Sequence, residues 1–194
     1  KNIMKFGNGT KKIVLLDLGT KKGVIDSLVR RDCEVIAVPA NTGAREILRL
    51  HPDGILVSDG PGDPGAIGYA IDTCRELLGK VALLGVGLGH QILALAMGAS
   101  ILRLPYGHRG SNHPVKNLEN NRVYITTQNH GFSLEESSLS GTGIEVTMRS
   151  LNDGSIEGIR HQEMPVFSLQ FDPEGYPGFS ETGFFYDDFI RQIG

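Results

Sequence analysis

The stretch that most constrains the fold of this chain is an apolar run that leads through a glycine-rich turn into a helix. Residues 81–86 are continuously apolar, as in a buried strand, and the sequence after the turn predicts a helix with Leu93 on its inner face. The turn itself, Gly-Val-Gly-Leu-Gly at 85–89, is too short for anything but a sharp strand-to-helix reversal. Such a turn presents one residue, at a strained backbone position, beside the amides of a helix N-terminus. In hydrolases that residue is a nucleophile, but the apex here is Gly87, which has no side chain.

The first hundred residues alternate between apolar strand-like runs and amphipathic helical segments. Strands are expected at 12–17, 34–39, 54–58 and 80–86, and helices at 19–31, 44–50, 66–78 and 88–97. Continuous apolar strands are typical of parallel sheets covered on both faces, and short connections require right-handed crossovers. This half therefore predicts a doubly wound, flavodoxin-like α/β sheet.

Past Gly98 the hydrophobic period changes from helical to alternating. Strands are expected at 123–127, 144–148, 155–160 and 166–171, and an amphipathic helix at 183–193. Turn residues such as Asn152-Asp153-Gly154 separate the strands and favour antiparallel pairing. We therefore expect a mostly parallel sheet with an antiparallel extension.

Length and composition limit the remaining possibilities. The 194 residues suffice for one domain, which we place at 12–194, with residues 1–11 interpreted as a linker remnant. A net charge of −3 gives no reason to expect nucleic acid or a membrane surface as a partner. Two cysteines are too few for a disulfide framework, and the start of the chain lacks the apolar core of a signal peptide. These features favour a cytoplasmic protein.

Ligands of an open parallel sheet bind beyond the carboxyl ends of its strands. Three loops are expected there, at 59–64, 85–91 and 172–174, and a fourth candidate is the polar, glycine-bearing turn expected at 128–132. The Gly60-Pro61-Gly62 segment leaves backbone amides free to face an oxyanion or a carboxylate. The amide of Leu88 points back at position 87, so converging N–H groups there would form an oxyanion hole.

The motifs at these loops resemble the class I, triad-type glutamine amidotransferase domain, and most specifically the glutaminase domain of the carbamoyl phosphate synthetase small subunit. The matching motifs are Gly-Pro-Gly-Asp-Pro at 60–64, Gly-His-Gln at 89–91, Asn-His-Pro-Val-Lys at 112–116, Gln-Asn-His-Gly-Phe at 128–132, and Phe-Ser-Leu-Gln at 167–170 leading into Pro173-Glu174. Members of this small-subunit group usually have a further N-terminal domain that docks on the synthetase, and a linker at residues 1–11 is consistent with that layout.

The resemblance implies a catalytic triad that this chain has largely lost. In the family an elbow cysteine attacks the side-chain amide of glutamine, a histidine activates the cysteine, and a glutamate orients the histidine. This chain has Gly87 in place of the cysteine and Asp172 in place of the histidine, so only Glu174 remains. Glycine offers no nucleophile, and two adjacent carboxylates repel each other, which raises the pKa of one of them. We therefore expect the glutaminase to be inactive.

No other residue is a good substitute for the lost groups. Cys33 precedes a strand and Cys74 lies mid-helix, where small buried apolar roles are expected. The histidines at 90, 113 and 130 belong to the matching motifs, and His161 follows a strand at a polar turn. No metal site and no cofactor are expected.

The resemblance also implies a glutamine pocket whose residues are still present. Its positions correspond to Gly60, Gly62, Leu88, Gln91, Asn129, Gly131 and Phe132. Each has a purely structural alternative: the glycines as turn residues, Gln91 as a helix cap, Asn129 as a turn residue and Phe132 as core.

Three functions remain open at this point. The first is a degenerate glutaminase subunit that docks on the large subunit of a carbamoyl phosphate synthetase. The second is a non-enzymatic module that senses glutamine or another small amide. The third is a hydrolase in which Asp172 or Glu174 activates a water molecule.

Overall fold

A ten-stranded sheet forms the centre of the computed structural model, which describes residues 3–175 and 181–193. Its strands are β1 (Met4–Phe6), β2 (Lys11–Asp17), β3 (Cys33–Pro39), β4 (Gly54–Val57), β5 (Ala82–Val86), β6 (Ile101–Asn117), β7 (Val123–Leu134), β8 (Ile144–Ser150), β9 (Ile156–His161) and β10 (Val166–Leu169). The helices are α1 (Lys22–Val29), α2 (Ala44–Leu48), α3 (Gly68–Leu77), α4 (Leu88–Ala96) and α5 (Phe184–Gln192), with short 3₁₀ turns η1 (Pro64–Ala66) and η2 (Glu136–Leu139).

The strand order is β1-β3-β2-β4-β5-β10-β9-β8-β6-β7. The five strands from β3 to β10 are parallel to one another, whereas β1 at one edge and β9, β8, β6 and β7 at the other pair antiparallel. The expected α/β sheet, mostly parallel in its wound half and extended by antiparallel strands, is therefore confirmed.

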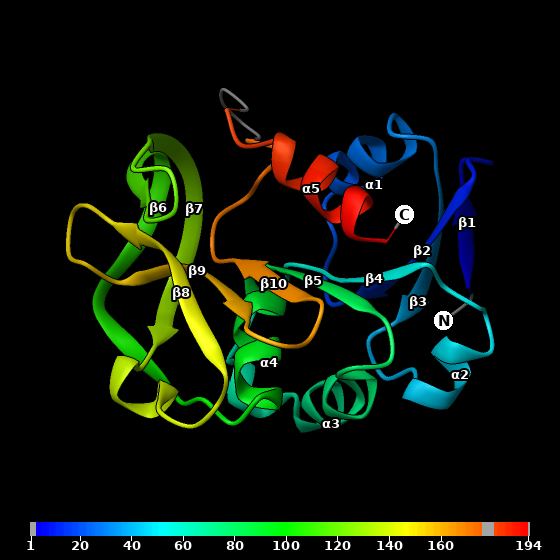
Figure 1. Ribbon diagram of the computed structural model, residues 1–194, viewed down its shortest axis with the longest axis horizontal. Helices are drawn as coiled ribbons and strands as arrows, with labels where there is room; N and C mark the ends of the chain where they lie inside the picture. The colour runs from blue at the N-terminus through cyan, green and yellow to red at the C-terminus, as the bar shows by residue number, and fades with distance from the viewer. Residues whose placement is uncertain (1–2, 176–180, 194) are drawn as a thin grey trace.

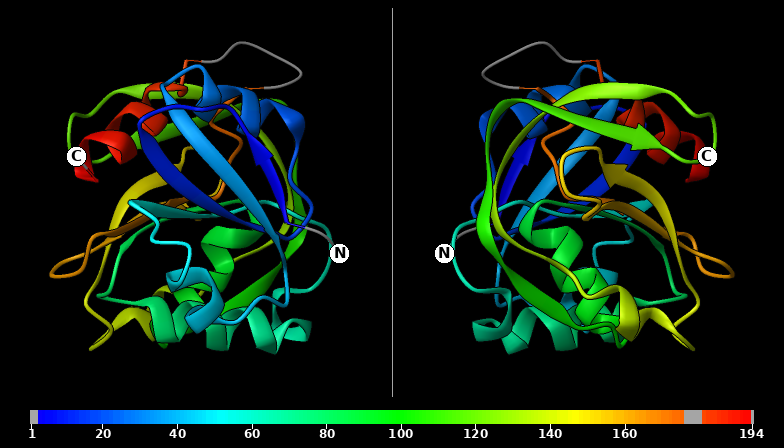
Figure 2. Two further views of the ribbon diagram at one scale, coloured as in Figure 1. Left: turned by 90° about the vertical axis from the view of Figure 1, so that its right-hand side faces the viewer. Right: turned by 90° about the vertical axis from the view of Figure 1, so that its left-hand side faces the viewer.

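Helices cover both faces of the parallel half, as its apolar strands require (Figure 1). Alternate residues of β2 point to opposite faces: Val14 and Leu16 pack with α2, α3 and α4, whereas Ile13 and Leu15 pack with α1 and α5. Figure 2 shows the same two helical layers from the sides. Burial on both faces explains why these strands are continuously apolar rather than alternating.

Three sequence-based assignments are wrong. Residues 4–6, assigned to a linker, form β1 and pair with residues 35–37 of β3. Residues 101–117, for which no strand was predicted, form β6 and pair with β7 along most of their length. The segment 128–132, predicted as a turn, lies inside β7. β6 contains prolines and glycines and accommodates them with register shifts between Arg103 and His108 and between Gly110 and His113.

No helix in residues 3–175 and 181–193 is long and apolar enough to cross a membrane.

Candidate functional site

The predicted strand-to-helix elbow is present between β5 and α4. Gly87 is the single residue between them, with φ 56° and ψ −113°, a conformation that is strained for residues with a side chain. Its N–H donates to the carbonyl of Leu169 on β10 at 2.9 Å, and its carbonyl accepts from the amide of His90 at 3.1 Å. These bonds fix the apex at the carboxyl edge of the parallel strands, where ligands of such sheets bind.

The side chain of Asp59 occupies the space above Gly87. Its Oδ1 accepts a hydrogen bond from the Leu88 amide at 3.0 Å, because the partly positive N-terminus of α4 attracts a carboxylate. A Cβ added at Gly87 would overlap with this oxygen and lie 2.6 Å from the Asp59 carboxyl carbon. The Leu88 amide, predicted as an oxyanion-hole donor, is therefore already bonded within the chain.

Asp172, the residue at the histidine position of the triad, forms an ion pair with Lys21. Lys21 Nζ lies 2.5 Å from Asp172 Oδ2 and 3.4 Å from Asp59 Oδ2, so one ammonium group joins the two carboxylates. Burial and the nearby charge of Glu174 raise the pKa of Asp172 to about 6, in spite of Lys21. Burial lowers the pKa of Lys21, but the hydrogen bond and charge of Asp172 outweigh it and leave that pKa above 10.5.

Glu174 is held by a residue that the sequence did not suggest. Its Oε2 accepts a hydrogen bond from the Tyr186 hydroxyl of α5 at 3.0 Å, and its Oε1 is buried without a hydrogen bond to the described part of the chain. Burial raises the pKa of the Glu174 carboxyl. Asp172 and Glu174 are thus two neighbouring acids with different partners, one bonded to Lys21 and the other to Tyr186.

The pocket residues inferred from the sequence lie around one open cavity of about 820 Å³. All seven line it: Gly60, Gly62, Leu88, Gln91, Asn129, Gly131 and Phe132. The same cavity is lined by Lys21, Asp59 and the segment 103–107. The last of these lies in β6, a strand that was not predicted. The lining therefore carries both cationic and anionic groups, as a zwitterionic ligand would need.

Gln91 has a structural role within this lining. Its Nε2 donates to the carbonyl of Phe132 at 3.2 Å and to Gln170 Oε1 at 2.9 Å, and only 3% of the residue is exposed. These bonds tie the elbow helix to β7 and to the segment after β10.

The cysteines lie in the core, as expected. Cys33 begins β3 and Cys74 lies in α3, and both are fully buried. Burial raises the pKa of the Cys33 thiol to about 11 and that of Cys74 to about 12. Both are therefore protonated near neutral pH, and neither is an activated nucleophile.

The histidines do not provide the missing base. His90 is buried in α4, its Nδ1 lies 2.8 Å from Ser168 Oγ, and burial lowers its pKa to about 3. His161 Nδ1 accepts from backbone amides of the following turn. Within residues 3–175 and 181–193, no histidine hydrogen-bonds to Asp59, Asp172 or Glu174.

A family comparison settles how this elbow and its loops are related to known proteins. The model for "Glutamine amidotransferase class-I" matches residues 14–192, which include the elbow, the cavity lining and the acidic pair. The chain belongs to the class-I glutamine amidotransferase family.

Relatives and solved structures agree with this assignment. The chain is 50% identical over 182 residues to the carbamoyl phosphate synthase small chain of Bacillus cereus, covering 94% of this chain and 50% of the relative. It resembles the structure of a Thermoplasma acidophilum protein assigned as a GMP synthase subunit, with TM-score 0.77, 19% identity and 96% and 93% of the two chains covered. A Thermotoga maritima glutamine amidotransferase gives TM-score 0.66 at 16% identity, covering 86% and 77%. This amidotransferase chain spans about half the length of the curated relatives it matches.

Proposed function

We propose that this amidotransferase chain is a carbamoyl phosphate synthase small-chain domain that no longer hydrolyses glutamine and that serves a structural or regulatory role on a synthetase large subunit. In this proposal residues 12–194, predicted as one domain, form that domain together with β1. The relatives at about 50% identity, all small chains of carbamoyl phosphate synthase, support the choice of partner.

The observation that carries the proposal is the occupied elbow. Gly87 lacks a nucleophile, and the Asp59 carboxylate lies where the first side-chain carbon of a nucleophile would be. The same carboxylate bonds the Leu88 amide at 3.0 Å, which removes that donor from any attacked carbonyl. Nucleophile and oxyanion donor are therefore lost together.

The residue at the position of the general base has also changed in a way that opposes glutamine hydrolysis. A general base in this reaction must take a proton from the nucleophile and return it to the leaving ammonia, which imidazole does near neutral pH. Asp172 is instead held at 2.5 Å by Lys21. Loss of one triad member lowers turnover by a factor on the order of 10⁴, and members of a triad act as a unit.

The proposal is tested by restoring the missing groups in steps. Glutaminase activity is measured for the unmodified chain, for Gly87→Cys with Asp172→His, and for these two changes combined with Asp59→Ala. We expect measurable turnover only in the triple variant, because Asp59 must leave before a cysteine side chain fits above the elbow. The matched control replaces Gly87→Cys by Gly87→Ala in the triple variant and should be inactive. Equal activity in the double and triple variants would contradict the role given to Asp59.

Partner binding is tested separately. The chain is mixed with the large subunit of a carbamoyl phosphate synthase and examined by size-exclusion chromatography. Co-elution supports docking, whereas separate elution at micromolar concentrations contradicts the partner assignment.

The lining of the cavity favours a second candidate, a non-enzymatic glutamine sensor. Seven positions that correspond to the family's glutamine pocket surround one cavity of about 820 Å³, together with groups of both charges. Calorimetric titration with glutamine should give heat that Asn129→Ala reduces. Asn152→Ala, in the exposed turn between β8 and β9, is the matched control. Absence of heat at millimolar glutamine would contradict this candidate.

A further inference from the structure

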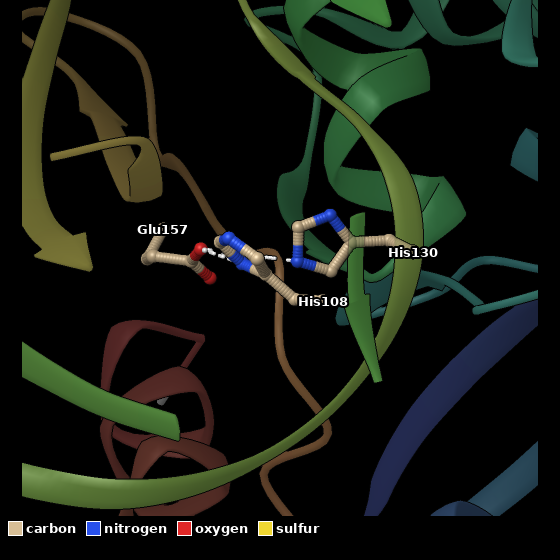
Figure 3. Close-up of side chains that lie close together, drawn as sticks. All are labelled: His108, His130 and Glu157. Atoms are coloured by element: carbon tan, nitrogen blue, oxygen red, sulfur yellow. Dashed lines mark ion pairs between the residues drawn. The ribbon is translucent and has the colours of Figure 1, made fainter. Parts of the chain in front are cut away.

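A group of buried polar side chains lies beside the cavity and has no part in the proposed function. His108 is on β6, Gln128 and His130 are on β7, and Glu157 is on β9. One ligand atom from each of His108, His130 and Glu157 lies within 4.8 Å of the other two (Figure 3). Their exposed fractions are 6%, 9% and 0%, so the group is enclosed by the antiparallel half of the sheet.

Each imidazole has an inner nitrogen, which faces the other side chains of the group, and an outer nitrogen, which faces away from them. Each outer nitrogen already lies against a hydrogen-bond acceptor. His108 Nε2 lies 2.9 Å from Asp153 Oδ2, and His130 Nδ1 lies 2.8 Å from the carbonyl of Phe132. A carboxylate and a carbonyl only accept, so each of these nitrogens carries a hydrogen. Histidines that bind metals are held in the same way, with one nitrogen on the ion and the other donating to a carboxylate or a backbone carbonyl.

The inner nitrogens face only acceptors. Gln128 Oε1 lies 2.8 Å from His108 Nδ1 and 2.9 Å from His130 Nε2. Glu157 Oε1 lies 3.3 Å from His108 Nδ1 and 3.8 Å from His130 Nε2. A neutral imidazole has one N–H, which His130 uses on Phe132, so its Nε2 lone pair points at the amide oxygen.

Rotating the Gln128 amide only moves this conflict to Glu157. Gln128 Nε2 donates to Glu157 Oε2 at 3.0 Å, so rotating the amide would place two acceptor oxygens against each other there. A cation among these side chains satisfies every inner lone pair at once.

We propose that His108 Nδ1, His130 Nε2 and Glu157 Oε1 bind one divalent transition-metal ion, with Gln128 Oε1 as a fourth ligand. Two imidazoles with oxygen donors in a closed, roughly tetrahedral arrangement favour Zn²⁺. Bonds of about 2.0–2.2 Å place tetrahedral donors roughly 3.4 Å apart. Glu157 Oε1 lies 3.3 and 3.8 Å from the two imidazole nitrogens, and the three ligand atoms, all within 4.8 Å of one another, draw together around the ion. Gln128 Oε1 moves outward by roughly half an ångström to reach the same spacing.

The ion has a structural role in this position. It joins β9, which pairs with β8 and β10, to β6 and β7, and it fixes the strand that carries Asn129, Gly131 and Phe132 into the cavity lining. The site is separate from the elbow and does not depend on whether glutamine is hydrolysed.

The probe is Zn²⁺ added to chain that has been treated with a chelator. Calorimetry should give about one ion per chain, and zinc should raise the melting temperature, because an ion that binds only the folded state stabilises it. X-ray absorption at the zinc edge should show two imidazole nitrogens at about 2.0–2.1 Å. Folded, chelator-treated chain that takes up no zinc at micromolar concentrations would overturn the proposal.

Variants locate the site. Glu157→Gln should abolish high-affinity binding, and Asp153→Asn, which changes only an outer partner of His108, should weaken it about 10–100-fold. His51→Asn is the matched control, because His51 is exposed, lies outside the cluster, and has φ 53°, which asparagine tolerates. Zinc affinity unchanged in Asp153→Asn and in Glu157→Gln would overturn the assignment. If Glu157→Gln does not fold, as judged by circular dichroism, Asp153→Asn and the absorption spectrum decide.

Discussion

Replacing Gly87 tests directly whether the Asp59 carboxylate occupies the elbow. A Cβ at Gly87 would lie 2.6 Å from the carboxyl carbon of Asp59, so Gly87→Ala forces that side chain away. Departure breaks the bond between Asp59 Oδ1 and the Leu88 amide at 3.0 Å. A charged hydrogen bond is worth about 1.5–3 kcal/mol, and the positive φ adds about 1–3 kcal/mol of backbone strain.

The two contributions separate in a double-mutant cycle. Gly87→Ala in the unmodified chain should lower the free energy of unfolding by about 2.5–6 kcal/mol, since it incurs both the strain and the lost bond. In an Asp59→Ala background the same change should cost only the strain, about 1–3 kcal/mol. The coupling energy between the two sites is then about 1.5–3 kcal/mol.

Urea denaturation of the four proteins, followed by circular dichroism, measures the cycle. Equal slopes of the transitions would show that the denatured states are comparable. Additive effects, with a coupling energy below about 0.5 kcal/mol, would refute the claim that the Asp59 carboxylate lies in the volume of a side chain at position 87.

Three further predictions concern the same region. Folding raises the pKa of Asp172 from 3.8 to about 6, so the stability contributed by this group is fully present below pH 4 and is lost as the pH rises through 6. The free energy of unfolding should therefore fall by about 3 kcal/mol between pH 4 and pH 7 because of this group, and Asp172→Asn should abolish that fall. Lys21→Met should destabilise the chain by about 1–3 kcal/mol in thermal unfolding, less than for a fully buried pair because the Lys21 side chain is 37% exposed; an unchanged melting temperature would contradict the ion pair. Gly89→Ala should cost at least about 3 kcal/mol, because its Cβ would lie 2.6 Å from the carbonyl carbon of Val57, whereas the control Gly68→Ala has free space; equal stability of the two would be inconsistent with the close packing of α4.

The wound half of the fold follows from sequence because its signals are local. Continuous apolar runs such as 12–17 indicate strands buried on both faces, and the helical periods between them indicate crossovers. The elbow at Gly87 was predicted for the same reason, since a strand, a one-residue turn and a helix are all adjacent in sequence. No strand was predicted for β6, because prolines and glycines interrupt its apolar pattern and its strand conformation depends on pairing with β7.

The contacts that define the site are long-range, which is why residue patterns did not reveal them. Lys21 and Asp172 are 151 residues apart, and nothing near Lys21 distinguishes it from an ordinary surface lysine. The position of Asp59 above the elbow depends on how β4 and β5 lie side by side. The histidine cluster draws on β6, β7 and β9, so missing β6 also concealed His108 as a partner of His130 and Glu157.

Glutamine hydrolysis by the unmodified chain is the measurement that most directly tests whether glutaminase activity has been lost. Isotope-labelled glutamine is incubated with the chain alone and with a synthetase large subunit, and labelled glutamate is quantified by mass spectrometry. No glutamate above the chain-free background is expected in either mixture, because the elbow has neither a nucleophile nor a free Leu88 amide. Steady glutamate formation that Asp172→Ala abolishes would contradict the loss of glutaminase activity and would establish hydrolysis by a different chemistry at the same site.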